Sequence, residues 1–264
     1  MTYLIIINGD DFGMNRRCST AIAAAFDKEL ITDTTMMANG DCFEYAVALA
    51  REKGFSDRIG IHFNLTEGTP LTKGITELRD FVSDGRFHKG FLSAPRLLNE
   101  AERIAVSAEL SAQAERLISS GIRITHADSH HYIHNNIYLA ELIAKVCAKH
   151  SIDMIRLSRT FDTPERPRVT ENIIDNRWWR EQGFKTTESF GRMSDVIGKE
   201  PTDDTEIMVH PDFDRNGVLI DRTGFVDGFP VGESLSALSA GLGAVKVCYS
   251  DLRQTNNSKK FRFR

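Results

Sequence analysis

Side chains that bind metal ions follow three apolar stretches of the sequence. Asp10 and Asp11 come directly after "YLIIING", His62 lies in "IGIHFNLTEG", and Asp128 and His130 lie in "THADSHHYIH". In parallel α/β folds the active-site groups collect at the carboxyl ends of the strands, so we expect these five side chains to converge. Two adjacent carboxylates at the end of a buried strand are costly to desolvate unless a cation neutralises them. The pattern therefore predicts a metal site.

The predicted donor set suits one divalent ion. Aspartate, histidine and water supply mixed oxygen and nitrogen ligands, and positions left for water are typical of a catalytic site. Imidazole favours zinc or another transition metal, whereas magnesium prefers more carboxylates, so the residues leave Mg²⁺ and Zn²⁺ open. One of the adjacent carboxylates can bind the metal while its neighbour takes a proton from the attacking water. The residues alone do not say which of Asp10 and Asp11 has which role.

Each of these residues also has an ordinary structural interpretation. The two aspartates could cap a helix that begins near Asn15, and His62 alone could be a strand histidine bonded to the backbone. Four histidines within "HADSHHYIH" are far above the average composition and favour a site instead. His210, in "EIMVHPDF", also ends an apolar stretch, where it is either a general acid or a packed histidine.

The elements that must position these side chains alternate along the chain. Apolar, β-branched runs predict strands, and apolar residues at helical spacing predict helices between them. The predicted strands are 3–8, 33–38, 58–65, 122–127, 153–158, 205–210 and 244–250, and the predicted helices are 19–30, 43–54, 101–121 and 136–150. Residues 163–191 have weak periodicity and predict long loops. The alternation predicts an α/β fold with mostly parallel strands, doubly layered or barrel-like.

The composition excludes several classes of protein. With 264 residues, a net charge of -4 and no long apolar run, we expect one domain over 1–264, no nucleic-acid partner and no membrane segment. An insertion around 70–95 and a short basic tail are expected within that domain. The first residues lack the basic start of a signal peptide and the four cysteines are far apart, which predicts reduced thiols and a cytoplasmic protein. An exposed "RWWR" segment could pack across a homodimer.

The sequence resembles the YdjC-like carbohydrate deacetylases, a family also called chitooligosaccharide deacetylases. The likeness is carried, in the family's order, by "NGDDFG", "TTMMANG", "GIHFNLTEG", "THADSHHYIH", "FKTTESFG", "EIMVHP" and "VKVCYSDL". The resemblance implies a modified TIM-like barrel akin to the polysaccharide deacetylases. It also implies metal-dependent hydrolysis of N-acetyl groups from an amino sugar or chitooligosaccharide, a small carbohydrate substrate.

The resemblance also implies a role for each candidate residue. Asp11, His62 and His130 would bind the metal, Asp10 would be the base, and His210 would be the acid that protonates the leaving amine. Asp128 would orient His130 or a neighbouring side chain from behind the metal ligands.

Two other functions fit the same residues. A metal-dependent phosphoesterase on a barrel also holds its attacking water with aspartate and histidine, although two-metal enzymes of this kind usually need more carboxylates. A non-catalytic sugar- or metal-binding protein would bind without turnover, and a carboxylate left beside a metal ligand argues against it.

Overall fold

An apolar strand, β1 (Leu4–Phe12), lies at the centre of the sheet and carries the two aspartates near its carboxyl end. The computed structural model describes residues 3–161, 173–196, 202–222 and 245–252. All of β1 beyond Leu4 is buried, because the strand has neighbours on both edges and the sheet is covered by helices. A strand buried on both faces needs a continuous apolar run rather than an alternating one, which explains "LIII".

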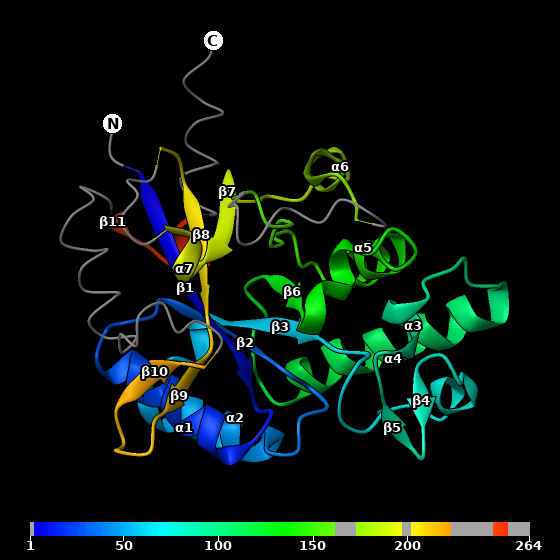
Figure 1. The fold of residues 1–264 in the computed structure, drawn as a ribbon, viewed down its shortest axis with the longest axis horizontal. Helices are drawn as coiled ribbons and strands as arrows, with labels where there is room; N and C mark the ends of the chain where they lie inside the picture. Colours follow the sequence, from blue (N-terminus) through cyan, green and yellow to red (C-terminus); the bar gives the residue numbers. More distant parts are fainter. Residues whose placement is uncertain (1–2, 162–172, 197–201, 223–244, 253–264) are drawn as a thin grey trace, which may run out of the picture.

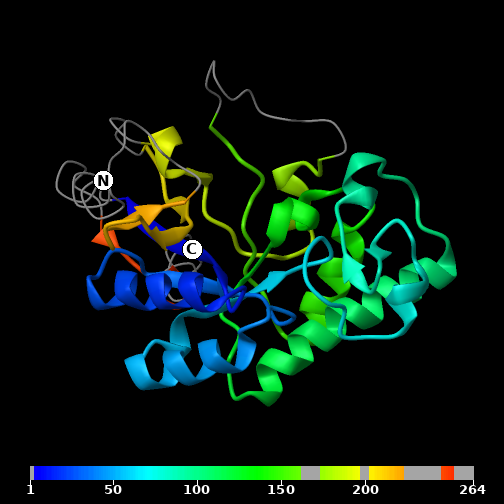
Figure 2. The same ribbon diagram turned by 60° about the horizontal axis from the view of Figure 1, so that its bottom comes forward.

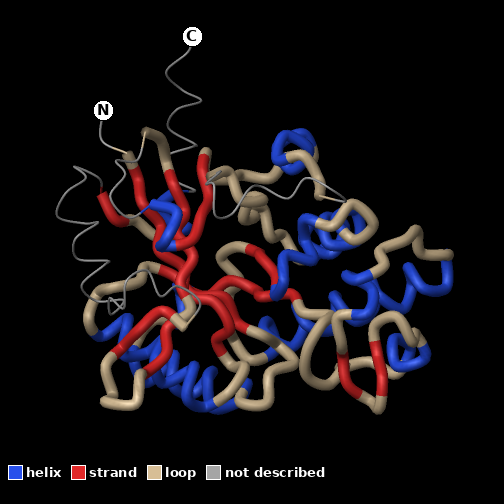
Figure 3. The backbone as a smooth tube through the Cα atoms, in the orientation of Figure 1, coloured by secondary structure: helices blue, strands red, loops and turns tan. Residues whose placement is uncertain are grey.

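The sheet that contains β1 is seven-stranded and parallel. The strand order is β6-β3-β2-β1-β8-β7, with β11 paired to the start of β1. The remaining strands are β2 (Asp33–Met36), β3 (Ile59–Phe63), β6 (Ala127–Ser129), β7 (Ser189–Arg192), β8 (Thr205–Val209) and β11 (Val245–Lys246). Figure 3 shows these strands at the centre of the molecule with helices outside them.

The two outer strands of this sheet are connected through isolated parallel bridges. Ala127 of β6 bridges to Ile155, and the adjacent Met154 bridges to Lys185, which begins the segment that leads into β7. The pairings therefore run from β6 through residues 154–155 and 185–192 back to β8. The predicted TIM-like, mostly parallel barrel is confirmed, with short bridges in place of full strands on one side.

The four predicted long helices are present. They are α1 (Arg16–Asp27), α2 (Phe43–Lys53), α4 (Glu100–Ser119) and α5 (Ala140–Lys149). Asn15 caps α1 by accepting the Cys18 N–H, and Asn99 forms a capping box with Glu102 at the start of α4. Figure 2 shows α1 and α2 side by side against the strands. Within the described ranges, every helix is too short or too polar to span a bilayer.

In the described part of the chain, two small antiparallel hairpins and several short helices lie in the connections (Figure 1). The segment predicted as an insertion, between β3 and α4, is held to α4 by the buried Glu109, which accepts the backbone N–H groups of Leu71 and Thr72. It contains η2 (Gly74–Glu77), β4 (Val82–Ser83), β5 (Arg86–Phe87) and α3 (Gly90–Ser93). The other short elements are η1 (Ser56–Arg58), η3 (His130–Asn135), α6 (Asn176–Glu181), α7 (Met193–Val196), β9 (Pro211–Phe213) and β10 (Leu219–Asp221).

Four local predictions differ from the structure. The predicted strand 244–250 is a strand only over β11, and residues 249–252 are helical. Residues 122–126 are not a strand, because Ile122 and Ile124 pack into the core from a loop and β6 begins only at Ala127. The predicted strand 153–158 has only the isolated bridges. The predicted loop region 163–191 contains α6, which Asp175 caps, and β7. Residues 163–172 and the basic tail lie outside the described residues.

Candidate metal centre

Three predicted ligands meet where β1, β3 and β6 end. Asp11 Oδ1 lies 3.2 Å from His62 Nε2 and 2.9 Å from His130 Nδ1. The ligand atoms of these three side chains all lie within 4.8 Å of one another, and all three side chains are buried. Because β1, β2, β3 and β6 are parallel neighbours in the sheet, their carboxyl ends bring together residues that are far apart in the sequence.

Two atoms of this trio have no hydrogen-bond partner. Asp11 Oδ1 and His62 Nε2 are both buried without one, although they face each other across 3.2 Å. A buried polar atom without a partner costs about 1–3 kcal/mol, more when it is charged. Burial raises the pKa of Asp11, but the two imidazoles outweigh burial and hold this pKa well below its ordinary value. An ionised carboxylate oxygen and two imidazole nitrogens that point at one space fit a divalent cation.

Asp10 has different partners from its neighbour. Arg156 binds it through two hydrogen bonds, NH1 to Oδ2 at 2.7 Å and NH2 to Oδ1 at 2.7 Å, and Asn8 Nδ2 donates to Oδ1 at 2.8 Å. Burial raises the pKa of Asp10, but the charge and hydrogen bonds of Arg156 outweigh burial and lower this pKa to about 2. Asp10 is therefore an ionised carboxylate beside the ligand trio at neutral pH.

Asp128 lies behind His62 rather than behind His130. Its Oδ1 accepts from His62 Nδ1 at 2.7 Å, and its Oδ2 accepts from Thr35 Oγ1 at 3.0 Å and pairs with Arg156 NH1 at 2.6 Å. Burial lowers the pKa of His62, but the charge of Asp128 and the neighbouring Asp11 outweigh burial and raise this pKa to about 10. Because the carboxylate of Asp128 accepts at Nδ1, the Nε2 of His62 is the nitrogen available to a cation.

His210 and Arg222 approach the trio from the opposite side. His210 follows β8 with its Nε2 4.0 Å from Asp11 Oδ2, and Arg222 NH2 donates to the same oxygen at 2.5 Å. The hairpin β9–β10 fixes both residues, since the His210 N–H donates to Asp221 Oδ1 and the Arg222 N–H donates to the His210 carbonyl. Asp11 therefore turns one oxygen to the histidines and the other to Arg222.

The backbone at this end of the barrel is strained. Asp11, His131 and Tyr132 have φ values of 71°, 53° and 57°, in the left-handed region that non-glycine residues rarely adopt. Such conformations cost about 1–3 kcal/mol each and persist only where surrounding contacts impose them. Three of the six non-glycine residues with positive φ in the described part of the chain thus lie at one predicted ligand or directly after another.

Two other histidines of "HADSHHYIH" have different environments. His126 is buried, stacks on Tyr249 at 3.7 Å and bonds Asn8, and His134 is buried against Ser129. Burial holds the pKa of both well below the ordinary value, so both are neutral packed histidines. The interpretation of the two aspartates as a helix cap is wrong, because Asn15 itself caps α1.

A cavity of about 170 Å³ opens onto the site. Asp10, Asp11, His62, His130 and His210 all line it, together with Ser129, His131, Tyr132, Arg192, Met208 and Arg222. Asp128 does not line this cavity.

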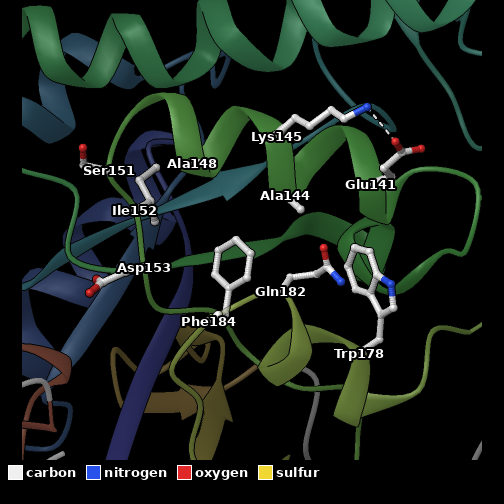
Figure 4. A pocket seen from close by; sticks show the side chains of 11 residues that line it. Glu141, Ala144, Lys145, Ala148, Ser151, Ile152, Asp153, Trp178, Gln182 and Phe184 are labelled. Carbon is white, nitrogen blue, oxygen red and sulfur yellow. Dashed lines mark hydrogen bonds and ion pairs between the residues drawn. The ribbon is translucent and has the colours of Figure 1, made fainter.

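A larger cavity of about 580 Å³ lies between α5 and α6 (Figure 4). Trp178, Gln182 and Phe184 face α5 there, and Lys145 pairs with Glu141 at 2.6 Å. Its lining includes residues 151–153 and 183–184, which precede the bridging segments, so it lies at the opposite ends of the strands from the site. It has no histidine and none of the predicted site residues, and we do not assign the active site to it.

Sequence reasoning missed three residues around the ligands. Arg156 could have been found from the sequence, because a lone arginine within the apolar "DMIRLS" must be paired with a carboxylate if it is buried. No sequence pattern indicated Glu67, whose Oε2 lies 2.9 Å from His130 Nε2. None indicated Arg222 either, which contacts Asp11 although 211 positions separate the two residues in the sequence.

Fold and site together define an α/β barrel protein with a candidate metal centre at the carboxyl ends of its strands. Residues 4–235 match the model of the YdjC-like protein family. The chain belongs to this family.

Proteins related to this chain carry a consistent name. A "Carbohydrate deacetylase" of Brevibacillus brevis is 31% identical over 221 residues, covering 81% of this chain and 84% of the relative. Another of Listeria monocytogenes is 32% identical over 216 residues, covering 79% and 81%. A solved structure from Enterococcus faecalis, whose proposed role is cleavage of cellobiose phosphate, superposes with a TM-score of 0.69 at 20% identity, covering 96% of this chain and 99% of that one. The similarity to this solved structure shows the fold alone.

Proposed function

We propose that this protein is a metal-dependent carbohydrate N-deacetylase that removes the acetyl group of an amino sugar or a chitooligosaccharide-like substrate. The observation that carries the proposal is the buried Asp11–His62–His130 trio, open to a cavity that the ionised Asp10 also lines. Membership of the YdjC-like family and relatives named carbohydrate deacetylase support it.

Asp11, His62 and His130 are the side chains that would hold the ion, and the donor set accommodates Zn²⁺ or Mg²⁺. A bound divalent ion supplies a Lewis acid for the amide carbonyl oxygen and lowers the pKa of the attacking water. Asp128 orients His62 and so fixes the nitrogen that faces the ion.

The chain's own residues would then move two protons. Asp10 takes a proton from the water whose oxygen attacks the acetyl carbon, and Arg156 holds the Asp10 carboxylate in place. His210 gives a proton to the amide nitrogen as the carbon–nitrogen bond breaks, which releases acetate and the free amine. The position of His210 across Asp11 from the two histidines, with its backbone fixed by Asp221, supports this role.

The arrangement around Arg156 argues against a two-metal phosphoesterase. Asp10, His62 and Asp128 form a second group of potential ligands, but the guanidinium of Arg156 binds both of these aspartates. A fixed cation therefore already occupies the place of a second ion, which favours one metal per site.

The reaction is tested by a product screen. Full-length protein with added Zn²⁺ or Mg²⁺ is incubated with N-acetylglucosamine, chitooligosaccharides and sugar phosphates, and acetate and phosphate are measured separately. We expect acetate and no phosphate. Phosphate release would establish the phosphoesterase instead, and binding of sugar with neither product would establish a binding protein.

The compartment and the assembly are part of the proposal. All four cysteines are free, three of them buried, which supports a reducing compartment such as the cytoplasm. Trp179 is buried and its indole N–H faces Asn135, so the half-buried Trp178 is the tryptophan of the "RWWR" segment that remains for a homodimer contact.

A further inference from the structure

A rigid loop follows β3 and ends beside the candidate metal centre. Asn64 Oδ1 accepts the N–H groups of Thr66 and Glu67, and Asn64 Nδ2 donates to Asn39 Oδ1 and to the Glu67 carbonyl. Gln113 of α4 bonds both the N–H and the carbonyl of Asn64. Asn64 and Gln113 are fully buried, so this network sets the position of the loop.

The loop directs two side chains at consecutive histidines. Thr66 Oγ1 lies 2.9 Å from His131 Nδ1, and Glu67 Oε2 lies 2.9 Å from His130 Nε2. Gly68 closes the loop with φ +78°, and a side chain there would meet Asn39 at 3.2 Å. The loop therefore contacts the strained turn that carries His130.

The contact with Glu67 determines which nitrogen of His130 carries the proton. The Glu67 carboxylate, whose Oε2 lies 2.9 Å from His130 Nε2, can only accept a hydrogen bond. His130 must then donate from Nε2, which leaves the lone pair of Nδ1 for the space beside Asp11 Oδ1, 2.9 Å away. Asp128 accepts from Nδ1 of His62 in the same way, and this leaves Nε2 of His62 for the ion.

We infer that Glu67 is a positioning residue for the metal centre: its carboxylate holds His130 in the tautomer and orientation that present Nδ1 to the ion. The inference rests on the proposed metal centre. Carboxylates behind a ligating imidazole typically contribute about 10- to 100-fold to metal affinity. Glu67 thereby gives the second imidazole the same support that Asp128 gives the first.

The test compares metal binding in four full-length proteins: wild type, Glu67→Ala, Glu67→Gln and Glu77→Gln. Glu77 is an exposed glutamate of the same connection and serves as the matched control. We expect Zn²⁺ affinity to fall about 10- to 100-fold in Glu67→Ala. The zinc affinity of Glu67→Gln, whose amide oxygen still accepts from Nε2, should fall less. The zinc affinity of Glu77→Gln should equal that of wild type.

A second measurement reads the tautomer directly. Nitrogen NMR of His130 in the zinc-bound protein should show Nε2 protonated and Nδ1 bound to the ion in wild type and Glu67→Gln, and a mixture of Nδ1-bound and Nε2-bound imidazole in Glu67→Ala. Wild-type zinc affinity in Glu67→Ala, with the tautomer unchanged, would overturn the inference and leave the proposed function standing. A wild-type protein that binds no divalent ion would overturn the metal centre itself, and the inference with it.

Discussion

Asp10 and Asp11 are adjacent in sequence but have separate sets of partners. Asp10 is bonded at both oxygens by Arg156, whereas Asp11 turns one oxygen, without a hydrogen bond, to His62 and His130. This difference supports Asp11 as the metal ligand and Asp10 as the base, which the residue types alone leave undecided. It also accounts for two like charges at the end of one buried strand, because each has its own cationic environment.

Asp10→Asn tests the base. The amide keeps the shape of the carboxylate and can still accept from Arg156, but it cannot take a proton from water. We expect turnover to fall about 10²- to 10⁴-fold while zinc affinity stays near that of wild type. Acetate release and metal titration measure the two effects, with circular dichroism to confirm folding. A folded, zinc-binding variant that keeps more than about a tenth of the activity would rule out this role.

At the scale of elements, the loops after β1 and β2 hold each other in place. The N–H of Cys42 donates to the Gly13 carbonyl, and the N–H of Met37 donates to the Phe12 carbonyl. A side chain at Gly40 would lie 2.2 Å from the Gly13 carbonyl oxygen, closer than any real contact. Only glycine allows the two loops to approach this closely beside Asp11.

Gly40→Ala should therefore disturb both stability and the site. We expect a loss of about 1–3 kcal/mol in the free energy of unfolding, from overpacking against backbone, together with weaker zinc binding as Asp11 shifts. Gly54→Ala is the control, because Gly54 has φ +77° with no atom within 4 Å. It should cost about 1 kcal/mol and leave zinc binding unchanged. Equal zinc affinity in the two variants would contradict this account of the loops.

Much of this architecture could be predicted from the sequence, and the reasons are physical. β1 and the four long helices have continuous apolar runs or helical periodicity, so local pattern identified them. The convergence of Asp11, His62 and His130 followed from the rule that parallel strands share a carboxyl edge. β7 was missed because it is short and depends on tertiary pairing, and for the same reason the predicted strand 153–158 is reduced to isolated bridges at 154–155. Glu67 and Arg222 were missed because loops and a hairpin bring them to the site.

At the scale of the whole molecule, the fold buries a group of charged side chains beside the site. Arg156 pairs with Asp10, Asp128 and Glu206, and the Tyr249 hydroxyl donates to Glu206 at 2.5 Å. Burial raises the pKa of Glu206 to about 7 and that of Asp33 to about 8. The folded protein therefore carries carboxyl groups that hold protons near neutral pH.

Asp33 makes stability depend on pH. Its pKa is 3.8 ordinarily and about 8 when folded, so between these values the folded state holds a proton that the unfolded chain has lost. Stability should fall as pH rises through this window, by up to about 1.4 kcal/mol per pH unit. Asp33→Asn removes this dependence. Urea unfolding measures the free energy of unfolding of both proteins at pH 5 and pH 8. The decrease in this free energy from pH 5 to pH 8 should be smaller in Asp33→Asn than in wild type by at least about 2 kcal/mol. Identical losses would show that Asp33 is ionised in the fold.

The central claim is that one divalent ion at Asp11, His62 and His130 is required for deacetylation. The most direct measurement removes all metal with a chelator, clears the chelator, and follows acetate release from N-acetylated chitooligosaccharides as Zn²⁺ or Mg²⁺ is added back. The account predicts no turnover in the stripped protein and full recovery at about one ion per chain. Turnover that persists after complete metal removal would contradict it.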